Sequence, residues 1–432
     1  MQAEDGVQGS RASDISVSIE EAIREGRLAP GAQLPTVRSL ADRLQVSPST
    51  VSAAYRYLRQ RGVISTHGRG GTRVHSRPPV DSTSVHTAAE LAPGVRSIST
   101  PPVEQELGQI NRDALAELAE RRDIDDEGQL ERRLAKDLDA VGIDAGAVVA
   151  FGSAREALSR AIESHLLPGD RVAIEAPSSA VVRDVLSLNG LEPVLMQLDM
   201  LGAIPRSLSS ALPKVRAVIL TPRGQEPTGS AVDAARASEL RTVLRSRPDV
   251  LAIELDPFGD LAGAPFESVV EPGFPLWAHI RSYHDMFAGQ GDLAVLGADP
   301  VTLSRAKGRQ LLGGTDLTPM ARRLALNVLD HPGTPHRSDG LQRHLAARRV
   351  MLMAALRHRG IDSQGASGPY VWIPTPDQRS TAAGLQALGW HVQTDDRPDD
   401  PANQGVRVAV DALDAAGASR FADDLLEVLA DL

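Results

Sequence analysis

The stretch QLPTVRSLADRLQVSPSTVSAAYRYLRQRGVISTHGRGGTRV, residues 33–74, decides the fold of the N-terminal part of the chain. Apolar residues recur in residues 36–44, and again in residues 48–62, at the spacing of one helix face, which predicts two amphipathic helices. Thr36 and Ser47 are suited to cap them, because a hydroxyl oxygen accepts hydrogen bonds from the first free backbone N–H groups. The residues that follow are typical of two short strands around a glycine-rich turn.

Another helix is expected just before this stretch, over residues 13–26, where isoleucines recur at a spacing of four. Two helices joined by a turn of about three to four residues, the second opening with small hydroxyl residues, form the helix-turn-helix pattern. The charge distribution agrees with this interpretation. Residues 28–78 hold eight arginines and one acid, Asp42, in a chain whose net charge is −10. A basic segment in an acidic chain indicates a surface for phosphate groups.

Composition bounds the remaining possibilities. The chain has 432 residues, 42% of them hydrophobic and 24% charged, which is ordinary for a globular protein of two or three domains. Cysteine is absent, so disulfides and thiolate metal sites are excluded. The N-terminus is acidic and no apolar run reaches the ~18 residues of a membrane span. We therefore expect a cytoplasmic protein that has no membrane partner.

The segments PGAQLPTVRSLA, VSPSTVSAAYRYL and GVISTHGRGGT, within residues 28–74, resemble the GntR-type winged helix. The resemblance implies that the second helix of the motif enters the major groove of double-stranded DNA and that the wing contacts the minor groove or the backbone. Pro48 departs from the family, in which many members have arginine there, so the operator preference stays open. Carried over residue by residue, the resemblance implies DNA contacts from Arg38, Ser47, Ser49, Thr50, Ser52, His67, Gly68 and Arg69.

Beyond the winged helix the sequence is organised in three further parts. Residues 79–106 are rich in Pro, Ser and Thr without periodicity, which predicts a linker after a DNA-binding domain over 1–78. Continuous apolar runs then alternate with helical patterns, which favours an α/β fold with a mostly parallel sheet covered on both faces, over residues 107–336. Residues 337–432 are typical of a smaller α+β subdomain. The expected sheet strands are 147–151, 171–176, 193–198, 216–221, 250–255 and 293–297.

The segments GSAREAL, LLPGDRVAIEAP, LTPRGQEPTG, AIELDPF and GVRVAV, spread over residues 107–432, resemble the fold-type I aminotransferase-like domain of the MocR subgroup of GntR regulators. Such domains bind pyridoxal phosphate through a lysine. In this chain the lysine position falls on Asp285 and that of the phosphate-binding arginine on Asp292. The acid that meets the pyridine nitrogen falls on Leu255 or Asp256, depending on the register.

Other positions also depart from the family pattern. The aromatic residue, the asparagine and the partner's tyrosine of the cofactor pocket fall on Ser179, Glu226 and near Asp123. The chain has three lysines, and none stands at the right place in the order: Lys136, Lys214 and Lys307. A carboxylate cannot form the covalent bond that the cofactor requires, and two acids beside a phosphate repel it. We therefore expect no cofactor and no enzymatic activity.

Arg407, in GVRVAV, matches the arginine that clamps a substrate carboxylate in the resembled fold, although an ordinary strand arginine is an equal alternative. Asp285 and Asp292 would favour a cationic group and Arg407 a carboxylate, so together they would favour a small zwitterionic effector. The expected ligand pocket comprises Asp285, Asp292, Arg407 and Asp256. His331 and His336 lack the sequence context of metal ligands, so no metal site is expected.

Together these patterns predict a homodimeric transcriptional regulator that binds a double-stranded DNA operator through its winged helix. The aminotransferase-like part would serve dimerisation and, in addition, sensing of a small molecule. The alternative is a regulator or aminotransferase that depends on pyridoxal phosphate. In a third possibility, the large domain is a scaffold that binds no ligand.

Overall fold

The computed structural model describes residues 7–29, 31–60, 63–66, 71–74, 128–283, 292–394 and 404–432. The chain forms two compact units, of which one contains the N-terminal helices and hairpin and the other contains a large sheet. The wing residues His67, Gly68 and Arg69, the linker 79–106, and Asp285 lie outside the described residues.

The N-terminal unit has three helices and a hairpin, as the sequence predicts. Its elements are α1 (Ala12–Arg24), α2 (Val37–Leu44), α3 (Pro48–Gln60), β1 (Ile64–Thr66) and β2 (Thr72–Val74). The Thr36 side chain caps α2 by accepting from the backbone N–H of Ser39 at 3.2 Å. Gln45 ends this helix in the left-handed conformation, with φ of 56°. The core is closed by buried side chains from every helix, among them Ile15, Ile19, Leu40, Val51 and Leu58.

An eight-stranded sheet forms the centre of the large unit, in the order β3-β10-β9-β8-β7-β4-β5-β6. Pairs β4/β7, β7/β8 and β8/β9 are parallel, whereas β10 is antiparallel to both of its neighbours. This mostly parallel arrangement confirms the predicted fold class. The strands are β3 (Val148–Phe151), β4 (Arg171–Ala176), β5 (Glu192–Asp199), β6 (Gly202–Ala203), β7 (Ala217–Leu220), β8 (Leu251–Asp256), β9 (Trp277–Ser282) and β10 (Ala294–Ala298).

Strand β9 is absent from the sequence prediction because its segment, WAHIRS, does not form an apolar run. His279 and Arg281 interrupt the pattern, yet both side chains are buried. The β8–β9 register places Glu254 opposite His279 and Asp256 opposite Arg281. Each basic side chain therefore meets an acid on the neighbouring strand, and this compensates for its burial.

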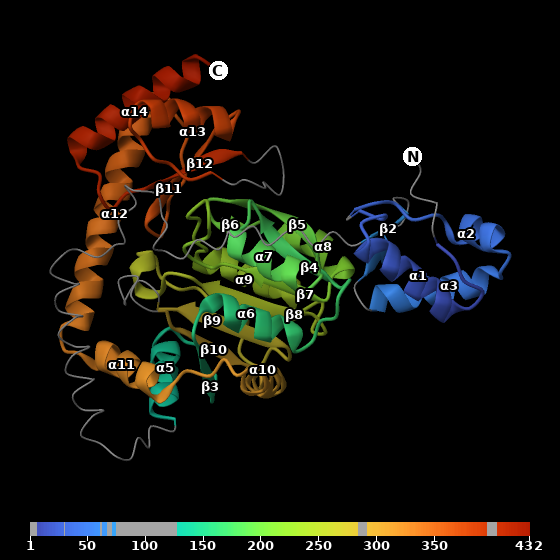
Figure 1. The fold of residues 1–432 in the computed structure, drawn as a ribbon. Helices are drawn as coiled ribbons and strands as arrows, with labels where there is room; N and C mark the ends of the chain where they lie inside the picture. Colours follow the sequence, from blue (N-terminus) through green and yellow to red (C-terminus); the bar gives the residue numbers. More distant parts are fainter. Residues whose placement is uncertain are drawn as a thin grey trace. The chain divides into compact units, whose positions relative to one another are not determined.

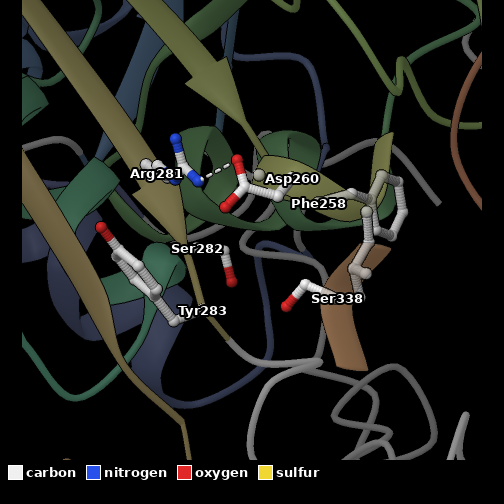
Figure 2. A pocket seen from close by; sticks show the side chains of 8 residues that line it. Phe258, Asp260, Arg281, Ser282, Tyr283 and Ser338 are labelled. Atoms are coloured by element: carbon white, nitrogen blue, oxygen red, sulfur yellow. Dashed lines mark ion pairs between the residues drawn. The ribbon is translucent and has the colours of Figure 1, made fainter. Parts of the chain in front are cut away.

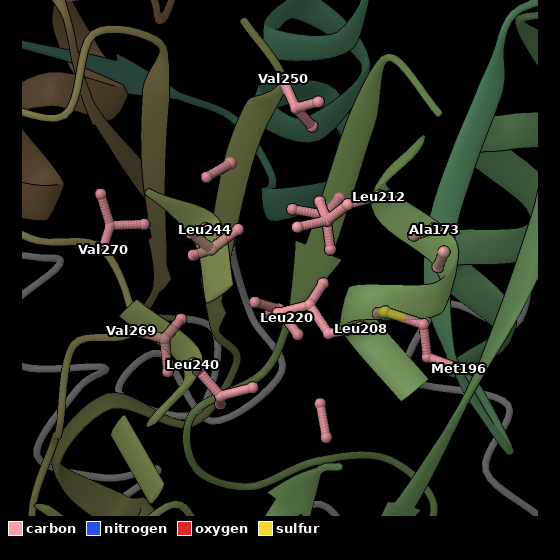
Figure 3. Close-up of a cluster of buried hydrophobic side chains, with 14 of the residues drawn as sticks. Ala173, Met196, Leu208, Leu212, Leu220, Leu240, Leu244, Val250, Val269 and Val270 are labelled. Atoms are coloured by element: carbon pink, nitrogen blue, oxygen red, sulfur yellow. The ribbon is translucent and has the colours of Figure 1, made fainter. Parts of the chain in front are cut away.

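Helices cover the sheet and bury its apolar side chains. The core of α8 (Pro205–Ala211) and α9 (Ala234–Leu244) packs on β4, β7 and β8, as Figure 3 shows with Leu208, Leu240 and Leu220. A second cluster joins α5 (Gln129–Ala140) and α11 (Pro319–Asp330) to β3 and β10. Helices α6 (Ala154–Glu163) and α10 (Pro300–Gly313) contact β9 and β10. The remaining helix α7 (Ala180–Leu188) and the short turns η3 (Leu212–Lys214) and η4 (Gly259–Ala262) connect strands.

The C-terminal part begins with the 25-residue helix α12 (Thr334–His358), which packs on α14 (Ala415–Ala430) (Figure 1). Antiparallel strands β11 (Tyr370–Pro374) and β12 (Gly405–Ala409) and helix α13 (Gln378–Ala387) complete it. Next to β12, Gln393 forms an isolated bridge with Arg407. Leu352, Val371, Val406 and Phe421 lie at the centre of its core.

Gly405 supplies a test of this packing. A Cβ at this position would lie 2.4 Å from Cζ2 of Trp372 and 2.6 Å from the carbonyl oxygen of Ile373. We expect Gly405→Ala to lower the free energy of unfolding by about 1–3 kcal/mol, because a packed core resists added volume. Gly340→Ala is the control, since nothing lies within 4 Å of its Cβ and alanine favours the helix. Equal urea midpoints for the two variants would contradict this account.

Candidate functional site

The turn between α2 and α3 carries a cluster of hydroxyl groups. Ser47 caps α3 by accepting from the backbone N–H of Thr50 at 3.1 Å. Its Oγ also lies 2.7 Å from Oγ of Ser49 and 2.8 Å from Oγ1 of Thr50. Three residues that the sequence singled out therefore meet at the start of α3, where the positive end of the helix favours anions.

Helix α3 separates a buried face from an exposed face. Val51, Ala54 and Leu58 are buried, and Tyr55 is fixed by donating from its hydroxyl to the carbonyl of Pro35 at 2.8 Å. The opposite face presents side chains at positions i, i+3 and i+7, which share one side of a helix. These side chains are Ser49, Ser52 and Arg56.

Arg56 is a residue that the sequence interpretation missed. Its side chain is exposed, and the spacing from Ser49 and Ser52 would have been enough to find it. Arg38 is likewise exposed, on α2. In the wing, Ile64 pairs with Val74, and Arg73 donates to the carbonyl of Gly31 at 3.0 Å. The described surface of this unit therefore combines the hydroxyl groups at the start of α3 with exposed arginines, among them Arg38 on α2 and Arg56 on α3.

In the large unit, Asp256 at the end of β8 is engaged by an arginine. Arg223 Nε and Nη2 donate to the two carboxylate oxygens of Asp256, each at 2.8 Å. The carboxylate is fully buried. Burial by itself would raise the pKa of Asp256, but the hydrogen bonds and charge of Arg223, with the charge of Arg281, hold that pKa below its ordinary value. Asp256 is therefore a structural anion rather than an open ligand contact.

A small hollow lies between η4, the end of β9 and α12. Figure 2 shows Arg281 in its lining, with Nη2 at 2.7 Å from the carboxylate of Asp260. Tyr283 points its hydroxyl away to donate to Asp137 on α5 at 3.0 Å. The lining is Phe258, Gly259, Asp260, Leu261, Arg281, Ser282, Tyr283 and Ser338.

Arg407 on β12 also has partners already. Its Nη1 donates to Oε1 of Glu226 at 2.5 Å, and its Nε donates to Oε1 of Gln393 at 2.8 Å. The guanidinium lies 4.3 Å from the ring centre of Tyr370. Tyr370 in turn meets Phe258 edge to face, with ring centres 6.1 Å apart. Arg407 is thus linked through two aromatic rings to the end of β8.

The expected pocket residues are therefore brought together only in part. Arg407 and Asp256 belong to one region, through Tyr370 and Phe258. Asp292 is exposed before β10, where its carboxylate accepts from the backbone N–H of Leu293 at 2.9 Å. Asp285 lies outside the described residues.

No amine is found near this region in the described part of the chain. Lys136, Lys214 and Lys307 are all exposed, on α5, η3 and α10. Among the described residues no group of three or more histidines and acids is arranged for a metal ion. Within those same ranges no helix is both long and apolar enough to cross a membrane.

Glu175, at the end of β4, is a buried acid that the sequence interpretation did not single out. Its Oε1 accepts from the backbone N–H of Thr221 at 3.2 Å. Burial raises the pKa of Glu175 to about 7, against the lowering effect of hydrogen bonds from Thr221 and Gln225. Through Thr221, Glu175 contacts residues 221–230, TPRGQEPTGS, which we call the joint segment.

A winged helix with a cluster of hydroxyl groups at the start of α3 is typical of a DNA-binding regulator. The relatives of the chain are also regulators. Residues 11–74 match the family model for bacterial regulatory proteins, gntR family. The chain is 30% identical, over 98% of its length and 99% of the relative, to the vitamin B6 salvage pathway transcriptional repressor PtsJ of Salmonella typhimurium. The HTH-type pyridoxine biosynthesis transcriptional regulator PdxR of Corynebacterium glutamicum is 26% identical over 56% of each chain. This protein therefore belongs to the GntR family of transcriptional regulators, with relatives of the MocR type.

Solved structures similar to this chain include aminotransferases. A multiple substrate aminotransferase from Thermococcus profundus superposes with a TM-score of 0.68 at 15% identity, covering 78% of this chain and 90% of that one. Pyrococcus horikoshii kynurenine aminotransferase gives 0.66 at 18% identity, covering 75% and 87%. At this identity the likeness establishes the fold and not the activity.

The pKa of Glu175 predicts a pH dependence. An acid whose pKa is raised on folding stabilises the protein below its unfolded pKa, and that stability is lost as the pH rises through the folded value of about 7. Glu175→Gln should match the wild type near pH 4.5, the ordinary pKa of a glutamate, and exceed it by roughly 3 kcal/mol above the folded value. Exposed Glu427→Gln serves as the control. Urea unfolding across this pH range measures the effect. A difference in the free energy of unfolding between Glu175→Gln and wild type that stays constant with pH would exclude it.

Proposed function

We propose that the protein is a cytoplasmic, homodimeric regulator that reads a specific DNA operator through α3 and its wing. The domains would be the winged helix (1–78), a linker (79–106), the aminotransferase-like domain (107–336) and a small C-terminal subdomain (337–432). The hydroxyl cluster at the start of α3, on a winged helix with a complete core, is the observation that carries this proposal.

Each side chain has a role that its chemistry allows. Ser49 and Ser52 would contact base edges in the major groove, where a hydroxyl can donate or accept, and Arg56 suits guanine. Ser47, Thr50 and Arg38 would bind phosphates and fix the register. His67, Gly68 and Arg69 of the wing would contact the minor groove or backbone.

The large unit would pair two winged helices on a two-fold operator. A symmetric dimer presents two identical reading heads, so its operator should contain two half-sites related by the same symmetry or by a repeat. The dimer would also transmit a signal, because a ligand that binds one arrangement of the two heads better than another shifts operator affinity.

Regulation without a covalent cofactor is supported by the side chains near β8. The acid at the end of this strand, Asp256, is already paired with Arg223. All three lysines are exposed on other elements. These residues do not fit a cofactor that needs a lysine and a free carboxylate. We therefore propose that the region around Arg407 senses a small zwitterion noncovalently, and that the chain is not an aminotransferase.

A second candidate function concerns the regulated genes. Two relatives are named as regulators of vitamin B6 salvage and of pyridoxine biosynthesis. Those names favour genes of vitamin B6 metabolism as targets of this protein. The protein's own gene is the other possible target. Comparing binding to DNA upstream of vitamin B6 genes with binding to DNA upstream of the protein's own gene would separate the two possibilities.

Mobility shift assays on these upstream regions test the DNA-reading role. Wild-type protein should retard one of them in a sequence-dependent and salt-sensitive way, because phosphate contacts release counterions. Arg56→Ala should weaken binding about tenfold or more, and Arg38→Ala should lower the salt dependence. Arg309→Ala, an exposed arginine on α10, is the control. Unchanged retardation by the Arg38 and Arg56 variants would refute the assignment.

Borohydride reduction tests the absence of covalent cofactor. After incubation with pyridoxal phosphate, removal of the free cofactor by gel filtration and then reduction, the intact mass of the protein should remain that of the polypeptide. Aldimines on exposed lysines hydrolyse when the free cofactor is removed, and no lysine lies at the end of β9. A lysine-bearing aminotransferase treated in parallel should gain the mass of the reduced cofactor. An added mass that peptide mapping places on one lysine of this protein would establish the cofactor-dependent alternative.

A further inference from the structure

Glu226 and Arg407 form an ion pair between the sheet and the C-terminal part. Glu226 belongs to the joint segment, which follows β7, and Arg407 to β12. Their side chains are 23% and 21% exposed, so the pair is partly shielded from water. The two residues are 181 positions apart in the sequence. The pair therefore connects two parts of the fold that each have a hydrophobic core of their own.

The turn that presents Glu226 is fixed from within. Oε1 of Gln225 accepts from the backbone N–H of Thr228 at 3.2 Å and from its hydroxyl at 2.5 Å. Nε2 of Gln225 donates to the carbonyl of Pro177 at 2.8 Å. Held on both sides, the turn places the carboxylate of Glu226 at the guanidinium without much loss of side-chain freedom on pairing.

Arg407 is oriented as firmly. Gln393 accepts from both Nε and Nη2, and the backbones of the two residues exchange hydrogen bonds of 2.8 and 2.9 Å. The ring of Tyr370 lies against the guanidinium. These contacts direct Nη1 toward the sheet, where its acceptor is the carboxylate of Glu226. A guanidinium fixed in this way is a preformed site for one carboxylate.

The same joint is closed by two hydrogen bonds of Ser367 next to the pair. Ser367 Oγ accepts from the N–H of Gly224 at 2.6 Å, and the N–H of Ser367 donates to the carbonyl of Gly229 at 2.8 Å. A Cβ on Gly229 would lie 2.8 Å from the carbonyl oxygen of Ser367, so the two segments of the chain touch there. Glu226 therefore binds Arg407 in a closed joint.

We propose that Glu226 is a resident carboxylate ligand of Arg407, and that a carboxylate effector binds at Arg407 only by displacing it. This inference rests on the proposed sensing function. The two carboxylates offer the guanidinium the same chemistry, but Glu226 is tethered and so present at a high effective concentration. The apparent association constant for an effector is its intrinsic constant multiplied by the fraction of molecules in which Glu226 is released. An effector must therefore add contacts beyond its carboxylate.

Chemical rescue in the full-length protein tests the exchange. Glu226→Ala removes the CH2–COO⁻ end of the side chain, which acetate reproduces, so acetate should bind the vacancy and raise the melting temperature. The rise should be about 1–2 °C for a tenfold excess over the dissociation constant. Acetamide, which has the same shape without the charge, should give no rise. Neither compound should stabilise the wild type, in which the site is filled, nor Glu226→Ala/Arg407→Gln, which lacks the guanidinium.

Two results would overturn the inference: an equal effect of acetate on wild type and Glu226→Ala, or no effect on either. Should Glu226→Ala be recovered unfolded, refolding it in acetate or in acetamide gives the same decision, because only acetate should restore folded protein. Operator retardation by the wild type is measured in parallel. Failed rescue with intact retardation rejects the resident ligand alone, whereas rescue without retardation upholds it and rejects the proposed regulator role.

Discussion

The large unit depends on a buried ion pair, that of Arg223 with Asp256. Burying two charges is costly, and the cost is offset here only because the pairing is bidentate and the guanidinium finds a third acceptor in the carbonyl of Ala264. Arg223 lies in the joint segment, so this pair anchors one end of that segment to β8. The turn that carries Glu226 and the contacts of Ser367 with Gly224 and Gly229 lie in the same segment. This electrostatic contact thus fixes the joint segment at the end of β8, in the middle of the sheet.

Sequence patterns predicted what depends on near neighbours. The three N-terminal helices, their Thr36 and Ser47 caps and six sheet strands follow from periodicity and local hydrogen bonding. Strand β9 did not, because His279 and Arg281 are tolerated there through acids on another strand. The candidate pocket shows the same limit. Arg407 was found from its motif, but its partner Glu226 was read as a lost asparagine, since no local signal connects residues so far apart. Arg56 could have been found, because helical spacing alone exposes it.

The large unit has the fold of aminotransferases. Acids and arginines at the ends of β8 and β9 pair with one another in its interior. Fold similarity to enzymes is therefore compatible with membership of a regulator family, since activity depends on a few side chains and not on the scaffold. The winged helix, by contrast, retains the hydroxyl groups and exposed arginines that DNA recognition requires.

The long sequence separation of Glu226 and Arg407 has a consequence for inheritance. Each residue lies in a part of the chain with its own hydrophobic core, so a hybrid gene that joins the sheet of one relative to the C-terminal part of another can preserve both cores. Where the second relative lacks the matching residue, such a hybrid would leave one partly buried charge without its partner. The pair therefore couples the two coding segments, and it constrains recombination between them together with the contacts of Ser367.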